Sequence, residues 1–320
     1  MAMAPETAAP LHAVGATAAL TGTYGRLIAL CDALDVRVVP PDHLASAGDP
    51  EPAPGRDLAP DRDRDLGRDH TDGHAHGHGH AERLDGAVLA QDERALDAFI
   101  EAEAVRIRER HGHVPRRDVA ASRALHDYLW SVSLLMSGPW HLERRVPRVH
   151  PAEVRLNLAA AEFEVVTGSG FACLPDDPAA GLPGARVVSD QEALRAELRA
   201  AVVDHVSPLV AAFGRQVRRG PRALWGMVAD DLVSGIWYLG RILGREDEAV
   251  RAATELLPHG IPPFPGGADF RRLTGRGGAG HHTRTRLGCC LYYRIDPSQA
   301  CLTCPRTCDA ERIRRIEAGS

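Results

Sequence analysis

Five of the seven cysteines of this 320-residue chain lie close together near its C-terminal end, between Cys289 and Cys308. Because cysteine is otherwise rare in the chain, this density indicates a metal centre or a set of disulfides rather than chance. The first twenty residues have an apolar stretch with no positively charged segment before it, which predicts a cytoplasmic protein rather than a secreted one. In a reducing compartment, clustered cysteines indicate metal or redox chemistry more than disulfides.

The cysteine spacing narrows the kind of metal centre. Cys301 and Cys304 are separated by two residues, a spacing that lets both thiolates face one metal. Cys289 and Cys290 are adjacent, and on a regular strand their side chains would point to opposite faces. Gly288 gives the backbone the freedom to bend there, so both pairs can supply ligands. Four thiolates suit tetrahedral zinc or a two-iron cluster, and the adjacent pair argues against zinc, which favours two spaced pairs.

Charge and pattern exclude several classes of function. The net charge of -5 argues against non-specific nucleic-acid binding. No run of eighteen uncharged apolar residues occurs, so we expect no membrane span, while peripheral association with a membrane stays open. Neither a G-x-G-x-x-G after a strand nor a P-loop is present, so the chain should not bind NAD(P)H or FAD itself. Any electrons that it uses must then come from another protein.

We expect an α+β fold that is mainly helical, with a helix-rich domain, a small sheet and a short C-terminal cysteine segment. Residues 1–40 should form the N-terminal part of the helix-rich domain and residues 84–270 its main part. Residues 271–320 form the C-terminal segment. Residues 41–83 are acidic and rich in Pro, Asp, Arg, Gly and His, which predicts a disordered insertion. Its histidines could capture a metal loosely, or the insertion could be a tolerated low-complexity stretch.

Apolar periodicity and capping residues predict the elements. Residues 85–110 should form one long helix, and Asp118 should cap a helix over 119–137 that ends at Gly138-Pro139. Residues 190–217 should form one helix broken near Pro208, or two. The remaining helices are expected at 14–34, 221–243, 245–257 and 307–317, strands at 36–39, 155–166 and 185–188, and a linker or open loop from His259 on.

The C-terminal motif resembles a known family. The pattern Cys-Cys-x10-Cys-x2-Cys is similar to the C-terminal signature of the FhuF family of siderophore-iron reductases, and the ten residues between the pairs begin with Leu-Tyr-Tyr-Arg. The Arg-x-Arg of Arg284 and Arg286 and the triplet Leu224-Trp225-Gly226 are also similar to that family. The resemblance in specific motifs covers about the last forty residues.

The resemblance implies a 2Fe–2S cluster bound by Cys289, Cys290, Cys301 and Cys304, with no catalytic residue beyond the cluster. It makes the helix-rich domain of residues 1–40 and 84–270 the siderophore-binding substrate domain, and residues 271–320 the iron–sulfur segment. It implies a cytoplasmic reductase that passes one electron to Fe(III) held in a siderophore, with hydroxamates favoured, and releases Fe(II). A ferredoxin- or flavodoxin-like protein would supply the electron. Cys308 departs from the family pattern, and a ligand set that includes it stays open.

Other residues are candidates for supporting roles. Residues 271–320 hold ten arginines against four acids, net +6, so Arg284, Arg286 and Arg294 could tune the cluster electrostatically or lie on a solvated face. Trp225 and Trp237 could line a substrate pocket, although core packing is the more common role.

The histidine pair and the isolated cysteines have simpler interpretations. We expect a loop role for His281-His282 rather than a role as ligands. Cys31 and Cys173, which lie far from the cluster in sequence, should be structural.

Three functions of other classes remain as alternatives. The first is a structural zinc module with an interaction role. The second is a siderophore-binding protein that does not reduce its ligand. The third is an electron-transfer or sensing protein with another client. A zinc protein is colourless, whereas a 2Fe–2S protein absorbs visible light.

Overall fold

A computed structural model describes residues 12–32, 34, 36–39, 83–159, 162–168 and 170–318. The expected insertion at 41–83 lies outside these residues except for Arg83. The predicted class, α+β and mainly helical with small mixed sheets, is confirmed. No helix in the described part of the chain is both long enough and apolar enough to cross a membrane.

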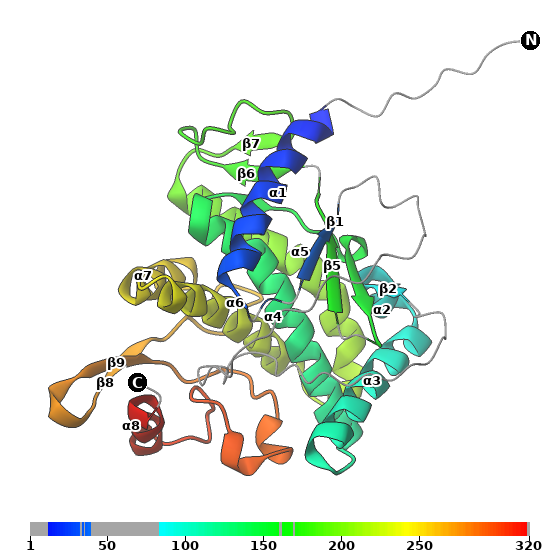
Figure 1. Cartoon of the computed structure of the whole chain (residues 1–320), viewed down its shortest axis with the longest axis vertical. Coiled ribbons are helices and arrows are strands. Elements are labelled where there is room, and N and C mark those ends of the chain that lie inside the picture. The colour runs from blue at the N-terminus through cyan, green and yellow to red at the C-terminus, as the bar shows by residue number, and fades with distance from the viewer. Residues whose placement is uncertain are drawn as a thin grey trace, which may run out of the picture.

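Three long helices form the centre of the molecule (Figure 1). They are α4 (Arg117–Glu143), α5 (Gln191–Val217) and α6 (Pro221–Ile242). Almost every residue of α4 from Val119 to Trp140 is buried, because α6, α5, α3 and α1 all pack against it. The outer helices are α1 (His12–Leu30), α2 (Gly86–Gln91), α3 (Glu93–His111), α7 (Glu246–Leu256) and α8 (Asp309–Ala318).

Small sheets flank the helices. The largest has the order β1-β5-β4-β2, with β1 (Val36–Val39) parallel to β5 (Glu162–Val166). β5 pairs antiparallel with β4 (Val154–Asn157), so the strand region predicted over 155–166 is two paired strands, and β4 also pairs with β2 (Arg83–Asp85). A second sheet joins β3 (Val146–Pro147), β6 (Phe171–Cys173) and β7 (Ala185–Val187).

The predicted helix over 85–110 is two helices, because Asp92 interrupts it. The Asp92 carboxylate accepts from the backbone N of Arg94 at 2.8 Å and so caps α3, while Asp85 caps α2 in the same way. A short polar side chain that binds the backbone competes with the helix interior and favours a new N-terminus.

The predictions for α4 were wrong at both ends. Asp118 lies in the first turn and pairs with Arg116, so it supports the helix start without capping it. The helix continues through Pro139 to Glu143, because burial of Trp140 beyond the proline offsets the missing hydrogen bond.

Proline also fails to break α5, which runs unbroken through Pro208. The buried Leu209 and Phe213 beyond the proline hold its second half in the core. Asp190 caps α5, and α6 begins at Pro221 and is buried on more than one face.

The segment from His259 is more ordered than the linker we expected. Phe264 and Ala268 are buried in the main core. The chain then forms an antiparallel hairpin of β8 (Arg271–Thr274) and β9 (Gly280–Thr283). From this hairpin it runs along one end of the helical body to α8 (Figure 1).

Two glycines in helix interiors should respond in opposite ways to an added methyl group. A Cβ at Gly138 would lie 2.6 Å from Leu27 Cδ2 in the α1–α4 contact, whereas the exposed Gly22 has nothing within 4 Å. We expect Gly138→Ala to lower the free energy of unfolding by about 1–3 kcal/mol through overpacking. Gly22→Ala, the matched control, should raise it by about 0.5–1 kcal/mol. Urea unfolding measures both, and equal effects would contradict the α1–α4 packing.

Candidate metal centre

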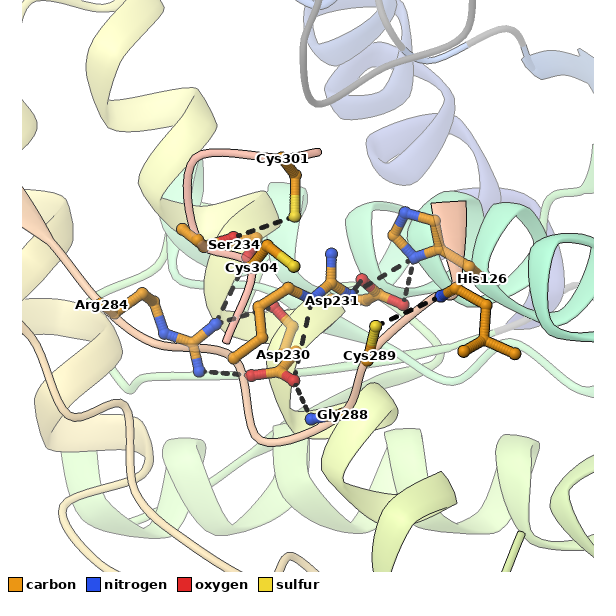
Figure 2. A network of polar contacts seen from close by, with 12 residues as sticks. His126, Asp230, Asp231, Ser234, Arg284, Gly288, Cys289, Cys301 and Cys304 are labelled. Carbon is orange, nitrogen blue, oxygen red and sulfur yellow. Dashed lines mark hydrogen bonds and ion pairs between the residues drawn. The ribbon is translucent and has the colours of Figure 1, made fainter. Parts of the chain in front are cut away.

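A buried ion pair joins the C-terminal segment to the central helix α6. Arg284 follows β9 and is completely buried, as is Asp230 in the middle of α6. The Arg284 Nη2 donates to Asp230 Oδ1 at 2.6 Å (Figure 2). Its Nε donates to the backbone O of Ala268 at 2.9 Å. The other Asp230 oxygen accepts from the backbone N of Gly288 at 2.6 Å. Asp230 therefore fixes the chain immediately before the first cysteine.

A second buried contact involves the neighbouring Asp231. Its carboxylate accepts from Arg286 and lies 2.9 Å from Nδ1 of His126 on α4. Arg286 Nη2 also lies 3.4 Å from the same His126 nitrogen. The backbone N of Arg286 donates to Thr303 O at 2.9 Å, so this arginine joins α4, α6 and both halves of the cysteine segment.

Burial and charge act in opposite directions on the two carboxyl groups. Burial raises the pKa of Asp230, against the lowering effects of Arg284 and Arg286. Burial also raises the pKa of Asp231, but His126 and Arg286 outweigh it and the net shift is downward. Because each buried guanidinium needs a counter-charge, we treat both pairs as ionic.

The segment also touches the helix backbone directly. A Cβ on Gly288 would lie 2.6 Å from the backbone N of Met227, and a Cβ on Gly226 would lie 3.2 Å from Leu287. Glycine at both positions permits this close approach. Leu224-Trp225-Gly226 therefore provides the surface on which the segment 287–288 rests.

The four predicted cysteines surround one small cavity. Cys289, Cys290, Cys301 and Cys304 line about 10 Å³ of space together with Arg286, Tyr292, Tyr293, Ala300 and Pro305. Hydrogen bonding with Cys301 raises the pKa of Cys290 and lowers that of Cys304, so the Cys301 thiol contacts both of the others. No group of three or more Cys, His, Asp or Glu side chains in the described ranges is arranged to hold one metal ion.

Hydrogen-bond donors point at the sulfurs. The backbone N of Leu291 lies 3.4 Å from Cys289 Sγ, and the Thr303 hydroxyl lies 3.8 Å from Cys301 Sγ. The backbone N of Arg306 bonds the Cys304 thiol. Leu291 has a left-handed φ of 65°, a conformation that costs some backbone strain. Donors of this kind stabilise thiolates bound to iron, so the residues present fit an iron–sulfur cluster.

Two cations lie beside the thiols, and only one was predicted. Arg286 interacts with Cys290 and Cys301. Arg123 on α4 hydrogen-bonds the Cys290 thiol, and its Nη2 donates to Asp127 at 3.0 Å. The ring of Tyr292 covers Arg123, with 5.1 Å from its centroid to the guanidinium carbon. Positive charge next to the sulfurs favours the thiolate form of the cysteines and stabilises the added electron of a reduced cluster.

The other predicted residues fall into three groups. Arg284 and Arg286 are buried, so the solvated-face alternative is wrong for both, because each neutralises an aspartate of α6. Arg294 is exposed beside Tyr293. Trp225 packs edge-to-face against Phe264, and Trp237 packs in the same way against Phe270. Neither tryptophan lines the thiol cavity or either of two other cavities among the described residues.

The remaining cysteines and histidines lie away from the thiol cavity. Cys31 and Cys173 are buried in the core and Cys308 is exposed. His281 and His282 lie in β9 rather than in a loop, because the pair forms ladder positions opposite Leu273 and Arg272.

A larger cavity lies far from the thiols. It has a volume of about 360 Å³ and is lined by the C-terminal end of α4, the turn between α6 and α7, and α7, including His141, Arg144 and Arg245. His141 follows Arg123 by eighteen residues on the same helix, a rise of about 27 Å. A molecule bound there would be too distant for direct electron exchange with the cysteine segment.

Sequence reasoning missed Asp230, Asp231, His126 and Arg123. The signal for the aspartates was present: two adjacent carboxylates in the middle of an apolar, buried helix require cationic partners. The Arg-x-Arg before the cysteines supplies those partners. Arg123 gave no comparable signal, because its role depends on how α4 lies beside the folded segment.

Comparison with known families agrees with the predicted resemblance. Residues 286–306 match the family model described as the FhuF 2Fe-2S C-terminal domain, and the four cysteines lie within the match. No curated protein matches the chain.

Removing one partner of the buried ion pair should be costly. We expect Arg284→Met to lower the free energy of unfolding by about 3–5 kcal/mol, since Asp230 is left without its counter-charge. Adding Asp230→Asn to that variant should recover part of the loss. Urea unfolding measures both, with Arg271→Met, which breaks a partly exposed pair with Asp309, as the control. A loss no larger than that of the control would contradict the inferred role of the pair.

Arg123 should raise the reduction potential of a bound cluster. Losing about 1–2 kcal/mol of charge interaction in Arg123→Gln should lower the potential by about 40–90 mV for one electron. Arg106→Gln, which changes an arginine paired with Glu103, is the matched control and should leave the potential nearly unchanged. An anaerobic redox titration followed by visible absorption checks this, and equal potentials in wild type and Arg123→Gln would remove Arg123 from the site.

Proposed function

We propose that this protein reduces ferric iron held in siderophores, with Cys289, Cys290, Cys301 and Cys304 as ligands of a 2Fe–2S cluster. The observation that carries the proposal is the meeting of these four thiols at one cavity within the segment that matches the FhuF-type domain. When bound, such a cluster supplies single electrons.

The chemistry requires little beyond one electron. Siderophores hold Fe(III) with hard oxygen ligands, and they hold Fe(II) far more weakly. Reduction therefore converts a tight complex into a labile one without a general acid or base. This agrees with the cavity lining, in which cysteines, tyrosines and an arginine surround the site.

The position of the segment suits exchange with two partners. Cys289 and Cys301 are partly exposed, whereas Cys290 and Cys304 are buried against the body. A chelate or a donor protein can therefore approach from the outside, while α4 and α6 hold the inner side. We propose a cytoplasmic ferredoxin- or flavodoxin-like donor and a siderophore acceptor, for which the resemblance favours hydroxamates.

The ligand assignment is tested by changing each cysteine of the segment to serine. We expect the variants at 289, 290, 301 and 304 to lose most of the visible absorption and the EPR signal of the reduced protein, because each removes one thiolate from iron. Cys308→Ser should keep both signals, since Cys308 is exposed and does not line the cavity. Loss of signal only in the Cys308 variant would overturn the assignment.

Reduction itself is tested with the purified holoprotein. Anaerobically reduced protein mixed with a ferric siderophore should release Fe(II) to a colorimetric trap, at up to one iron per stored electron. A coloured, reducible protein that releases no Fe(II) would identify a binding or electron-transfer protein instead. A colourless zinc protein would remove the redox function altogether.

A further inference from the structure

Two exposed arginines stand at the outer edge of the thiol cavity. The guanidinium carbon of Arg306 lies 4.4 Å from the ring centroid of Tyr293, and that of Arg294 lies 5.9 Å from it. The Arg294 Nε also donates to the Tyr293 hydroxyl at 3.3 Å. Tyr293 itself lines the cavity with the four cysteines. Both charges are therefore held beside the sulfurs by one aromatic ring.

Neither arginine is neutralised. Across the residues that the structure describes, no carboxylate lies within ion-pair distance of Arg294 or Arg306, whereas Arg271, Arg314 and Arg315 each have one. The nearby Asp118 is paired with Arg116, and Asp296 accepts from Ser298.

Part of the other positive charge of the segment is not at the surface. Arg284, Arg286 and Arg312 are buried. The exposed positive charge of residues 271–320 is therefore smaller than the formal charge of +6. Beside the cavity, the exposed positive charge is concentrated around Tyr293.

An electron acceptor must bind outside the cavity. A space of about 10 Å³ holds about one water molecule, whereas a drug-sized ligand needs a pocket of about 300 Å³ or more. A ferric chelate therefore contacts the outer surface, where Cys289 and Cys301 are partly exposed. The charges on that surface then decide which chelates stay long enough to react.

We propose that Arg294 and Arg306, with Tyr293 between them, form a docking site for ferric chelates that carry negative charge on their periphery. The proposal rests on the proposed function and deepens it: the site selects by outer charge, whatever group binds the iron. One electron leaves the reduced protein and converts the docked Fe(III) to Fe(II), and the external donor protein then restores that electron.

A small chelate fits these observations better than an acidic donor protein. A specific protein interface covers about 800 Å² per partner and uses charges spread over that area. Here two cations share one ring, which matches an anion of small size. An aromatic group of a chelate can also stack on a guanidinium, and a carboxylate can accept two parallel N–H hydrogen bonds from it.

The test uses one hydroxamate core with three outer charges. Desferrioxamine with its pendant amine free, acetylated or succinylated gives gallium(III) complexes with net charges of about +1, 0 and -1, and gallium cannot be reduced here. Titration calorimetry with the holoprotein should show binding that tightens by about threefold to tenfold from the cationic to the anionic complex, as expected for exposed charge pairs. The matching ferric complexes then give the reduction rates.

Two double variants locate the effect. Arg294→Gln with Arg306→Gln should abolish the charge preference. Arg251→Gln with Arg276→Gln removes the same net charge at exposed positions away from the cavity and should keep it. Binding that is independent of chelate charge, or a preference that survives the first double variant, would overturn the proposal.

The outcomes separate this site from the function on which it rests. If all three ferric complexes are reduced equally and bind equally, the reductase function stands and the docking site fails. If the gallium complexes show the preference but no ferric complex is reduced, the docking site stands and the reductase function fails. If the first double variant slows only reduction by the donor protein, the two arginines belong to donor binding and the proposal is wrong.

Discussion

The ion pair between Asp230 and Arg284 is the interaction on which the candidate site depends. Both side chains are completely buried, and the same aspartate also binds the backbone N of Gly288, next to the first cysteine. A buried charge pair of this kind adds little net stability over apolar packing, but breaking it is costly. Its effect is specificity: only one position of the C-terminal segment on α6 satisfies both charges.

The remaining contacts of the site follow from that position. With Gly288 seated against Met227, the segment places Arg286 between Asp231 and His126. Cys290 then faces Arg123 on α4, which the segment could reach only in this arrangement. The cysteines thus obtain one cation from α4, whereas the second cation and the N–H and O–H donors come from their own segment.

The sequence specified the local features better than the long-range ones. Alternating and periodic apolar residues located most helices, and the cysteine spacing located the segment with its four thiols. The errors at Pro139 and Pro208 have a common cause, because propensity rules describe an isolated chain and burial decided both cases. The break at Asp92 is local, since its side chain caps α3. The sequence could assign Arg284 and Arg286 as partners of Asp230 and Asp231 only through the rule that buried charges need counter-charges. Arg123 could not be assigned, because its position depends on how α4 packs.

The central claim is that the four thiols seated on α6 hold two irons. Mössbauer spectroscopy of protein produced with ⁵⁷Fe tests it most directly. The account predicts two high-spin Fe(III) sites with sulfur coordination, coupled to a diamagnetic ground state, and one extra electron localised on reduction. A sample that binds a single metal ion per chain, or iron with an uncoupled spectrum, would contradict it.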